Sequence, residues 1–310
     1  MATAQIATPE QAAWLGLLIE AGLLVATGVP GVYGRSGTFE AVRLGFDALI
    51  DRTVADEAAE VLRFPPVYPR QQFERMGYLA SFPHLAGSIF GFEGSEAQAA
   101  EQADHAARHE DWSAYQRMTE LVLVPAVCYP VYAAIADRGP LPTGGVTIDP
   151  GGSYVFRHEP SGDPARLQMF HMRELVRIAS PDVARAWRDA WLERGLALLR
   201  GLGLPAETDL ASDPFFGRGG RFLAASQREQ ALKVEILVPI AGPTPTAVAS
   251  FNYHQDHFTS LLGIAHAGGG EAHTACLGFG HERIVLALLH THGLDVAAWP
   301  VEVQDQLWAA

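Results

Sequence analysis

Cysteine, basic side chains and long apolar runs are all scarce in this chain. Only Cys128 and Cys276 occur among 310 residues, too few for a disulfide framework, so we expect a protein of the reducing cytoplasm. The N-terminal stretch has no basic region and carries Glu10 and Glu20, which argues against a secretory signal. The most apolar early stretch, residues 22–33, is shorter than the ~20 residues that a membrane span requires, so we expect no membrane partner.

Positive charge is the other shortage. The chain has 22 Lys and Arg residues against 35 Asp and Glu residues, a net charge of −13. Such an acidic surface suits a nucleic-acid partner poorly, because binding to phosphates needs clustered positive charge. It leaves room for a few arginines in one cleft. Hydrophobic residues make up 48% of the chain and charged residues 18%, which excludes a disordered protein.

The pattern of elements predicts an α+β protein, because helices come first and strands with interspersed helices follow. Hydrophobic spacing predicts helices over residues 9–26, 96–124 and 182–202, and one that begins near Ser36–Glu40 with Thr38 as the N-cap. The proline-rich segment 61–67 suits an edge strand or an interface segment. Alternation and turn residues predict further strands within residues 144–159, 167–175, 231–240, 247–254 and 275–280. The last of these strands is followed, through a glycine turn, by a helix.

The sequence contains neither GxGxxG nor GxxxxGK[ST], so a nucleotide would be held by neither common glycine loop. GxSxG is absent as well, which leaves a serine hydrolase triad without its usual signature. Arg157, Arg166 and Arg283 lie near predicted strand ends, and arginine suits phosphate oxygens. Three arginines could therefore clamp a nucleotide, although solvated surface arginines are the more common explanation for their spacing alone.

The cysteines and histidines give a weak metal signal when they are taken alone. Cys128 and Cys276 lie in apolar runs without a CxxC spacing, which is typical of small buried side chains. The histidines between His254 and His292 lack the HExxH pattern. We interpret most of them as surface or hydrogen-bonded loop residues.

Seven segments in order resemble a known family. FRHE, FHMRE and GFGHER have the order of motifs two and three of class II aminoacyl-tRNA synthetases. The chain resembles the zinc-dependent seryl-tRNA synthetases of methanogens and, more closely, the amino acid:[carrier protein] ligases, their truncated relatives. The likeness covers roughly residues 30–300 and is carried by LRFPPVYPRQQFERMGYLASFPHL, ELVLVPAVCYP, FRHEPSG, MFHMRELV, DPFFGRGG, SFNYHQDHF and AHTACLGFGHER.

The resemblance implies a fold and a nucleotide site. The fold would be one class II synthetase-like catalytic domain over residues 1–310, an antiparallel sheet flanked by helices, with a helical insertion or docking region at about 55–118. A homodimer is implied as well. The resemblance also implies a set of ATP-binding residues, and two of them, Arg157 and Arg283, would be catalytic. The set consists of Arg157 at the α-phosphate, Glu159 facing adenine, Arg166 and Leu167 in the closing loop, Phe170 beneath adenine, Arg283 at the γ-phosphate, Glu235 and Ser250 at magnesium and phosphate, and Lys233.

The same resemblance implies a zinc ion held by Cys128, Glu174 and Cys276. Three protein ligands leave a fourth position open, which is typical of a working metal site. That position would take the amino group of the substrate amino acid, with Glu174 and Asn252 beside it. The implied cofactors are thus Zn²⁺, one per subunit, and Mg²⁺ with ATP.

The implied function is activation of a small amino acid by ATP and transfer to the phosphopantetheine thiol of a carrier protein. Glycine is favoured as the substrate, followed by alanine and then serine. A docking patch is expected near Arg63, Arg70 and Arg75. Two alternatives stay open: aminoacylation of tRNA or another acceptor, which the acidic surface disfavours, and a catalytically silent paralogue, which the retained motif residues disfavour.

Overall fold

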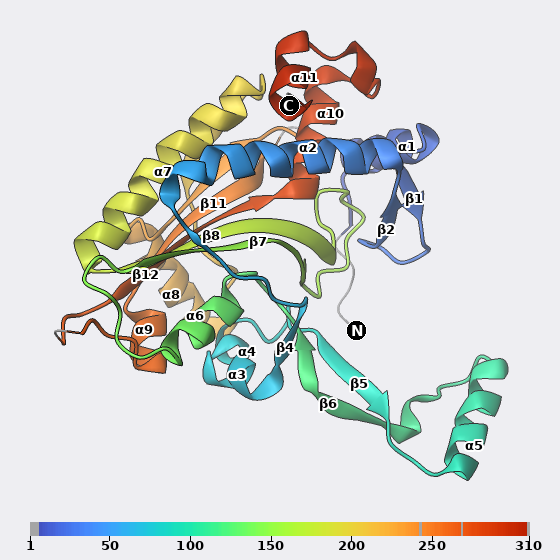
Figure 1. Cartoon of the computed structure of the whole chain (residues 1–310). Coiled ribbons are helices and arrows are strands. Elements are labelled where there is room, and N and C mark those ends of the chain that lie inside the picture. The colour runs from blue at the N-terminus through green and yellow to red at the C-terminus, as the bar shows by residue number, and fades with distance from the viewer. Residues whose placement is uncertain (1–5, 242–243, 268, 309–310) are drawn as a thin grey trace.

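A seven-stranded sheet forms the centre of the computed structural model, which describes residues 6–241, 244–267 and 269–308. Its strand order is β3-β7-β8-β12-β11-β10-β9, and all neighbours are antiparallel except β3 and β7. This arrangement confirms the predicted α+β class (Figure 1). The strands of this sheet are β3 (Glu60–Val61), β7 (Val146–Phe156), β8 (Met169–Ala179), β9 (Glu207–Leu210), β10 (Lys233–Val238), β11 (Thr246–Gln255) and β12 (His273–Gly280).

Helices cover both faces of this sheet, and each interface is a separate apolar core. On one face α2 (Gly37–Val54), α7 (Pro181–Gly201) and α10 (His281–His292) pack on Phe251 and Phe279. On the other face α6 (Tyr129–Ala136) and α9 (His257–Leu262) pack around Val176 and Cys276. Within the described ranges, no helix has the length and hydrophobicity needed to cross a membrane. The remaining α-helices are α1 (Pro9–Glu20), α3 (Arg70–Arg75), α4 (Tyr78–Ser81), α5 (Glu96–Ala107), α8 (Gly217–Glu229) and α11 (Val301–Trp308).

Two helix predictions near the N-terminus need correction. The predicted helix 9–26 ends at Glu20, because the chain turns through a left-handed Gly22 (φ +67°) into the short strand β1 (Leu24–Ala26). This strand pairs with β2 (Tyr33–Arg35). The N-cap of α2 is Ser36 and not Thr38, since the Ser36 hydroxyl accepts the amide of Phe39 at 3.2 Å.

Residues 96–124 are only half helical, contrary to the prediction. The helix α5 ends before His109, which has a left-handed φ of 58°. The chain then enters β6 (Gln116–Leu123), the middle strand of a three-stranded sheet with β4 (Val67–Pro69) and β5 (Ser88–Phe92). The predicted helical region 55–118 is therefore a mixture of helices and strands.

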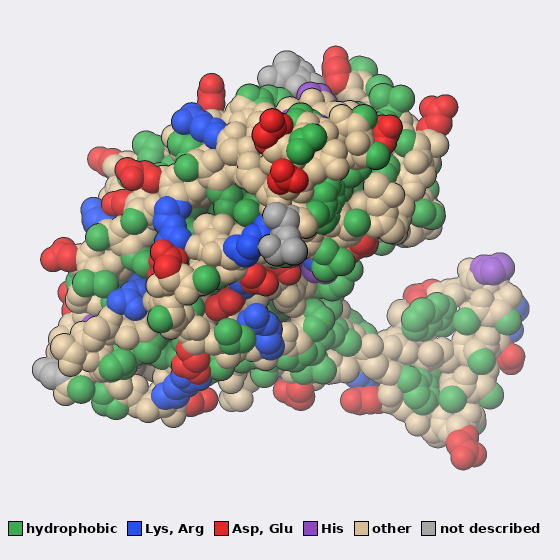
Figure 2. Space-filling view, turned by 45° about the horizontal axis from the view of Figure 1, so that its top comes forward, with side chains coloured by type: hydrophobic (Ala, Val, Ile, Leu, Met, Phe, Trp, Pro, Cys, Tyr) green, Lys and Arg blue, Asp and Glu red, His purple; other side chains and the backbone are tan. Residues whose placement is uncertain are grey.

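The strands β5 and β6, with α5 at their tip, form an arm that projects from the body of the molecule (Figures 1 and 2). Phe90 and Met118 face each other across the two strands and are both exposed.

The three arginines that we expect in a docking patch have partners within the chain. Arg63 donates to the carbonyl of Asp149, Arg70 pairs with Glu120 and Glu74, and Arg75 donates to the carbonyl of Leu261.

A buried ion pair fixes the start of α10, next to Arg283. The Glu282 carboxylate, 1% exposed, accepts the amide of His171 at 2.9 Å and pairs with Arg35. Burial alone would raise the pKa of Glu282, but the hydrogen bonds from His171 and the charge of Arg35 hold that pKa below its ordinary value.

We expect Glu282→Gln to destabilise the fold by about 3 kcal/mol, because it breaks a buried ion pair and leaves the largely buried Arg35 with Glu40, 3.4 Å from its Nε, as its remaining carboxylate. A carboxyl with a lowered native pKa stabilises the fold fully at neutral pH. That stabilisation is lost as the pH falls below the ordinary value of 4.5 through the native pKa. Urea unfolding at pH 7 and at pH 4 measures the free energy of unfolding at each pH. The change in that free energy between the two pH values should therefore be smaller for Glu282→Gln than for the unaltered protein. Glu302→Gln, at an exposed position of α11, is the control, and equal stability of both variants would contradict the prediction.

Candidate active site

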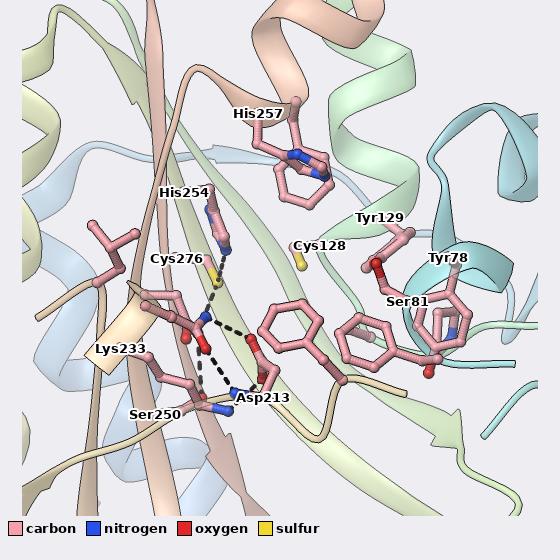
Figure 3. A pocket seen from close by; sticks show the side chains of 18 of the residues that line it. Tyr78, Ser81, Cys128, Tyr129, Asp213, Lys233, Ser250, His254, His257 and Cys276 are labelled. Carbon is pink, nitrogen blue, oxygen red and sulfur yellow. Dashed lines mark hydrogen bonds and ion pairs between the residues drawn. The ribbon is translucent and has the colours of Figure 1, made fainter. Parts of the chain in front are cut away.

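A cavity of about 410 Å³ opens on the α6–α9 face of the main sheet. Figure 3 shows side chains from several strands and from α6 pointing into it. The cavity brings together predicted site residues that are distant in sequence. They are Cys128 at the N-cap of α6, Arg157 after β7, Glu174 on β8, Lys233 on β10, Ser250 and Asn252 on β11, and Cys276 on β12.

Two thiols and a carboxylate meet at the base of this cavity. Cys128, Glu174 and Cys276 all line the cavity, and all three are almost completely buried. The neighbouring Cys128 thiol lowers the pKa of Cys276, and Cys276 in turn raises the pKa of Cys128. Burial, together with the charge of Cys276, raises the pKa of Glu174 to about 8. Without a cation, Cys128 and Glu174 therefore tend to keep their protons at neutral pH, and a cation bound among the three groups would favour their ionised forms.

The residues of this cluster fit a zinc ion in their chemistry. Thiolates and carboxylates are common zinc ligands, and the buried Oε2 of Glu174 has no hydrogen-bond partner. Asn252 Nδ2 lies 3.4 Å from Cys276 Sγ, opposite it in the β11–β12 pairing. Among the described residues, no group of three His, Cys, Asp or Glu side chains already has the geometry of a metal site. Zinc binding by Cys128, Glu174 and Cys276 stays a prediction.

Three arginines form a positive region beside the cluster. Arg157 lies over the ring of Phe170, 5.7 Å from its centroid. Arg283 donates from Nε to the carbonyl of Ala165 at 2.7 Å. Burial, and then the charges of Arg166 and Arg157, lower the pKa of Arg283 to about 10. Cations that disfavour one another in this way are well placed to receive a polyanion.

The other predicted ATP-binding residues lie around this region. Leu167, Phe170 and Arg283 line a second, narrow cavity of about 10 Å³. Arg166 and Glu159 form an ion pair with an N–O distance of 2.8 Å. Their roles toward a nucleotide stay predictions.

Lys233 is held by carboxylates on two sides. Its ammonium lies 2.6 Å from Asp213 Oδ1 and 3.1 Å from Glu235 Oε1, and Glu235 is paired with Ser250 across β10 and β11. Gln227 Nε2 donates to the second oxygen of Asp213 at 2.8 Å. Burial would raise the pKa of Asp213, but the charge of Lys233 keeps it low. The network ties β10 to α8, and no sequence motif predicts a role for Asp213 or Gln227.

Two histidines are exceptions to the surface or loop interpretation that applies to most of this group. His281 is completely buried, with Nε2 3.4 Å from Asp47 Oδ1. His254 lines the cavity, and its Nε2 lies 3.6 Å from Cys276 Sγ. The two-residue period of a strand was the signal for His254, since it shares a face of β11 with Ser250 and Asn252.

Comparison with curated proteins finds close relatives along almost the whole chain. No family model matches. The chain is 45% identical over 304 residues to "Amino acid--[acyl-carrier-protein] ligase 2" of Bradyrhizobium diazoefficiens, which covers 98% of this chain and 90% of the relative. It is also 45% identical over 286 residues to ligase 1 of that organism, covering 92% of this chain and 87% of the relative. A type-2 serine–tRNA ligase of Methanopyrus kandleri is 27% identical over 206 residues, 60% of this chain and 37% of that protein.

Solved structures share the fold. The M. kandleri seryl-tRNA synthetase, in a complex with tRNASec of A. aeolicus, superposes with a TM-score of 0.78 and 21% identity. The match covers 95% of this chain and 60% of that one. A cytoplasmic serine–tRNA ligase of Naegleria fowleri gives a TM-score of 0.71 and 14% identity, covering 96% of this chain and 65% of that one. This chain thus spans less than two thirds of either synthetase, and the likeness confirms the predicted class II synthetase-like fold. Its identity to the two Bradyrhizobium ligases places the chain in the amino acid–[acyl-carrier-protein] ligase family.

Proposed function

We propose that this protein activates a small amino acid with ATP and transfers it to the phosphopantetheine thiol of a carrier protein. The observation that carries the proposal is the cavity in which Arg157 lies with Cys128, Glu174 and Cys276. One site thus combines a guanidinium that can bind phosphate with two thiols and a carboxylate that can hold a metal ion for the amino acid. The two relatives with 45% identity are named amino acid–[acyl-carrier-protein] ligases, which supports transfer to a carrier protein.

In the first step, a carboxylate oxygen of the amino acid attacks the α-phosphorus of ATP. An oxygen–phosphorus bond forms, the bond to the β-phosphate oxygen breaks, and pyrophosphate leaves. Arg157 and Arg283 stabilise the negative charge on the phosphates, so positioning and electrostatics do most of the work. Glu235 and Ser250 would hold Mg²⁺ with the phosphates.

The thiol–carboxylate cluster orients the amino acid. Cys128, Glu174 and Cys276 would hold Zn²⁺, which when bound supplies a Lewis acid position for the free amino group. Asn252, 3.4 Å from Cys276, borders the same position. Glycine is our first expected substrate and alanine our second, with serine third.

In the second step, the phosphopantetheine thiol attacks the carbonyl carbon of the aminoacyl adenylate. The carbon–sulfur bond forms as the bond to AMP breaks, and the thiol proton leaves to solvent. The product is an aminoacyl thioester on the carrier protein. A cytoplasmic homodimer is part of the proposal, in keeping with the class II fold.

The test is pyrophosphate exchange into ATP, measured with glycine, alanine, serine and larger amino acids. Parallel samples are stripped of zinc, and labelled amino acid is then offered to a carrier protein with and without phosphopantetheine. We expect exchange with one small amino acid, its loss without zinc, and labelling of the modified carrier only. Labelling of tRNA instead would favour the synthetase alternative, and no exchange with any amino acid would favour a silent paralogue.

A further inference from the structure

His254 is the cavity residue whose contacts the proposed reaction leaves unexplained. Its Nε2 lies 3.6 Å from Cys276 Sγ, and its Nδ1 lies 3.2 Å from the Thr274 hydroxyl. Figure 3 shows the His254 ring directly over Cys276, with Cys128 across from it. Both ring nitrogens therefore have partners on β12, the strand that carries Cys276.

The ring is also held by packing. It meets Phe258 edge-on, with 5.0 Å between centroids, and lies 6.2 Å from the ring of Tyr132. Phe258 and Tyr132 are themselves stacked and buried. The direction of Nε2 toward sulfur is thus fixed by an aromatic wall as well as by hydrogen bonds.

With one proton on the imidazole, the hydrogen bonds have one self-consistent arrangement. A thiolate can only accept, so the proton on the imidazole must be at Nε2. Nδ1 is then an acceptor, and the fully buried hydroxyl of Thr274 donates to it. Thr274 thereby selects the tautomer in which His254 donates to Cys276, as outer partners do for ligands at many metal sites.

We propose that His254 is a positioning residue that donates a hydrogen bond from Nε2 to the Cys276 thiolate and so sets the affinity of the cluster for zinc. The proposal rests on the metal assignment in the proposed function. Together with Asn252, 3.4 Å away, His254 gives Cys276 two nitrogen donors. These donors stabilise the thiolate form and fix the direction of its remaining lone pairs toward the cavity.

The test compares zinc affinity in His254→Phe and His254→Gln with that of the unaltered protein. Phenylalanine keeps a ring against Phe258 but removes the donor, whereas glutamine keeps an N–H donor at a similar reach. Zinc affinity is measured with a competing chelator, and thiolate-to-metal absorption is recorded on cobalt-loaded samples. His257→Phe, a substitution of the nearby exposed histidine, is the matched control for zinc affinity.

We expect His254→Phe to bind zinc about 10–100-fold more weakly and to shift the cobalt–thiolate absorption, as loss of an outer hydrogen-bond partner does. His254→Gln should recover most of the affinity, and His257→Phe should bind zinc as tightly as the unaltered protein. Equal affinity of His254→Phe and the unaltered protein would overturn this inference and leave the metal assignment standing. Failure of the unaltered protein to retain zinc would overturn both.

Discussion

Arg283→Ala should reduce amino-acid-dependent pyrophosphate exchange by about 10³-fold, the upper end of the effect of losing one preorganised charge stabiliser. Arg283 lies beside Arg157 and Arg166, whose charges help to lower its pKa to about 10. The positive charge of Arg283 is therefore destabilised by its neighbours when no anion is bound and stabilised when the phosphates of ATP are bound. Its removal should cost far more in activity than in stability.

Exchange rate and thermal unfolding of the same samples provide the measurement. Arg283→Lys retains a charge but not the planar fork that donates to the carbonyls of Ala165 and Ala247, so we expect an intermediate loss of activity. Arg138→Ala removes an exposed pair with Glu60 and should leave exchange unchanged. An Arg283→Ala variant that exchanges at the normal rate would refute the arginine clamp.

Cys276→Ser should abolish both zinc retention and amino acid activation. The remaining donors, Cys128 and Glu174, are one short of the three protein ligands of a working zinc site, and a serine hydroxyl is not a thiolate at neutral pH. We expect the loss of zinc affinity to exceed the roughly 100-fold upper limit for an outer-partner change. Metal content after gel filtration and exchange activity measure the two effects.

The neighbouring substitution Ala275→Ser is the matched control, because Ala275 lies on the same strand but packs in a different apolar cluster from Cys276. It introduces the same hydroxyl without touching the thiol–carboxylate cluster. Ala275→Ser should retain zinc. Full zinc content in Cys276→Ser would show that the metal, if present, is held elsewhere.

The central hairpin and the β12–α10 junction could be predicted because local signals agree there. Residues 146–156 and 169–179 flank a polar loop that signals a hairpin, and glycines mark the turn into α10. The prediction of a helix over residues 116–123 is wrong, because the helical pattern stops with α5. Their strand conformation depends on pairing with β4 and β5, which are distant in sequence and carry no local signal.

The residues of the site likewise could be predicted only in part from local sequence. Cys128, Glu174 and Cys276 could be grouped only through the family resemblance, because nothing in their spacing brings them together. The partners of Lys233 and Cys276 escaped prediction, since Asp213 and His254 acquire their roles from contacts across the sheet. The cavity itself depends on two packed layers and has no sequence signature.

The place of β12 in the sheet has a consequence for synthesis of the chain. Among the described residues β12 is the last strand in chain order, and it lies between β8 and β11 at the centre of the main sheet. Until residues 273–280 emerge, β8 and β11 each present an unpaired edge with its backbone donors and acceptors open to other chains. A polypeptide released before residue 273 would carry both edges, so premature termination should yield aggregates and not a smaller soluble protein.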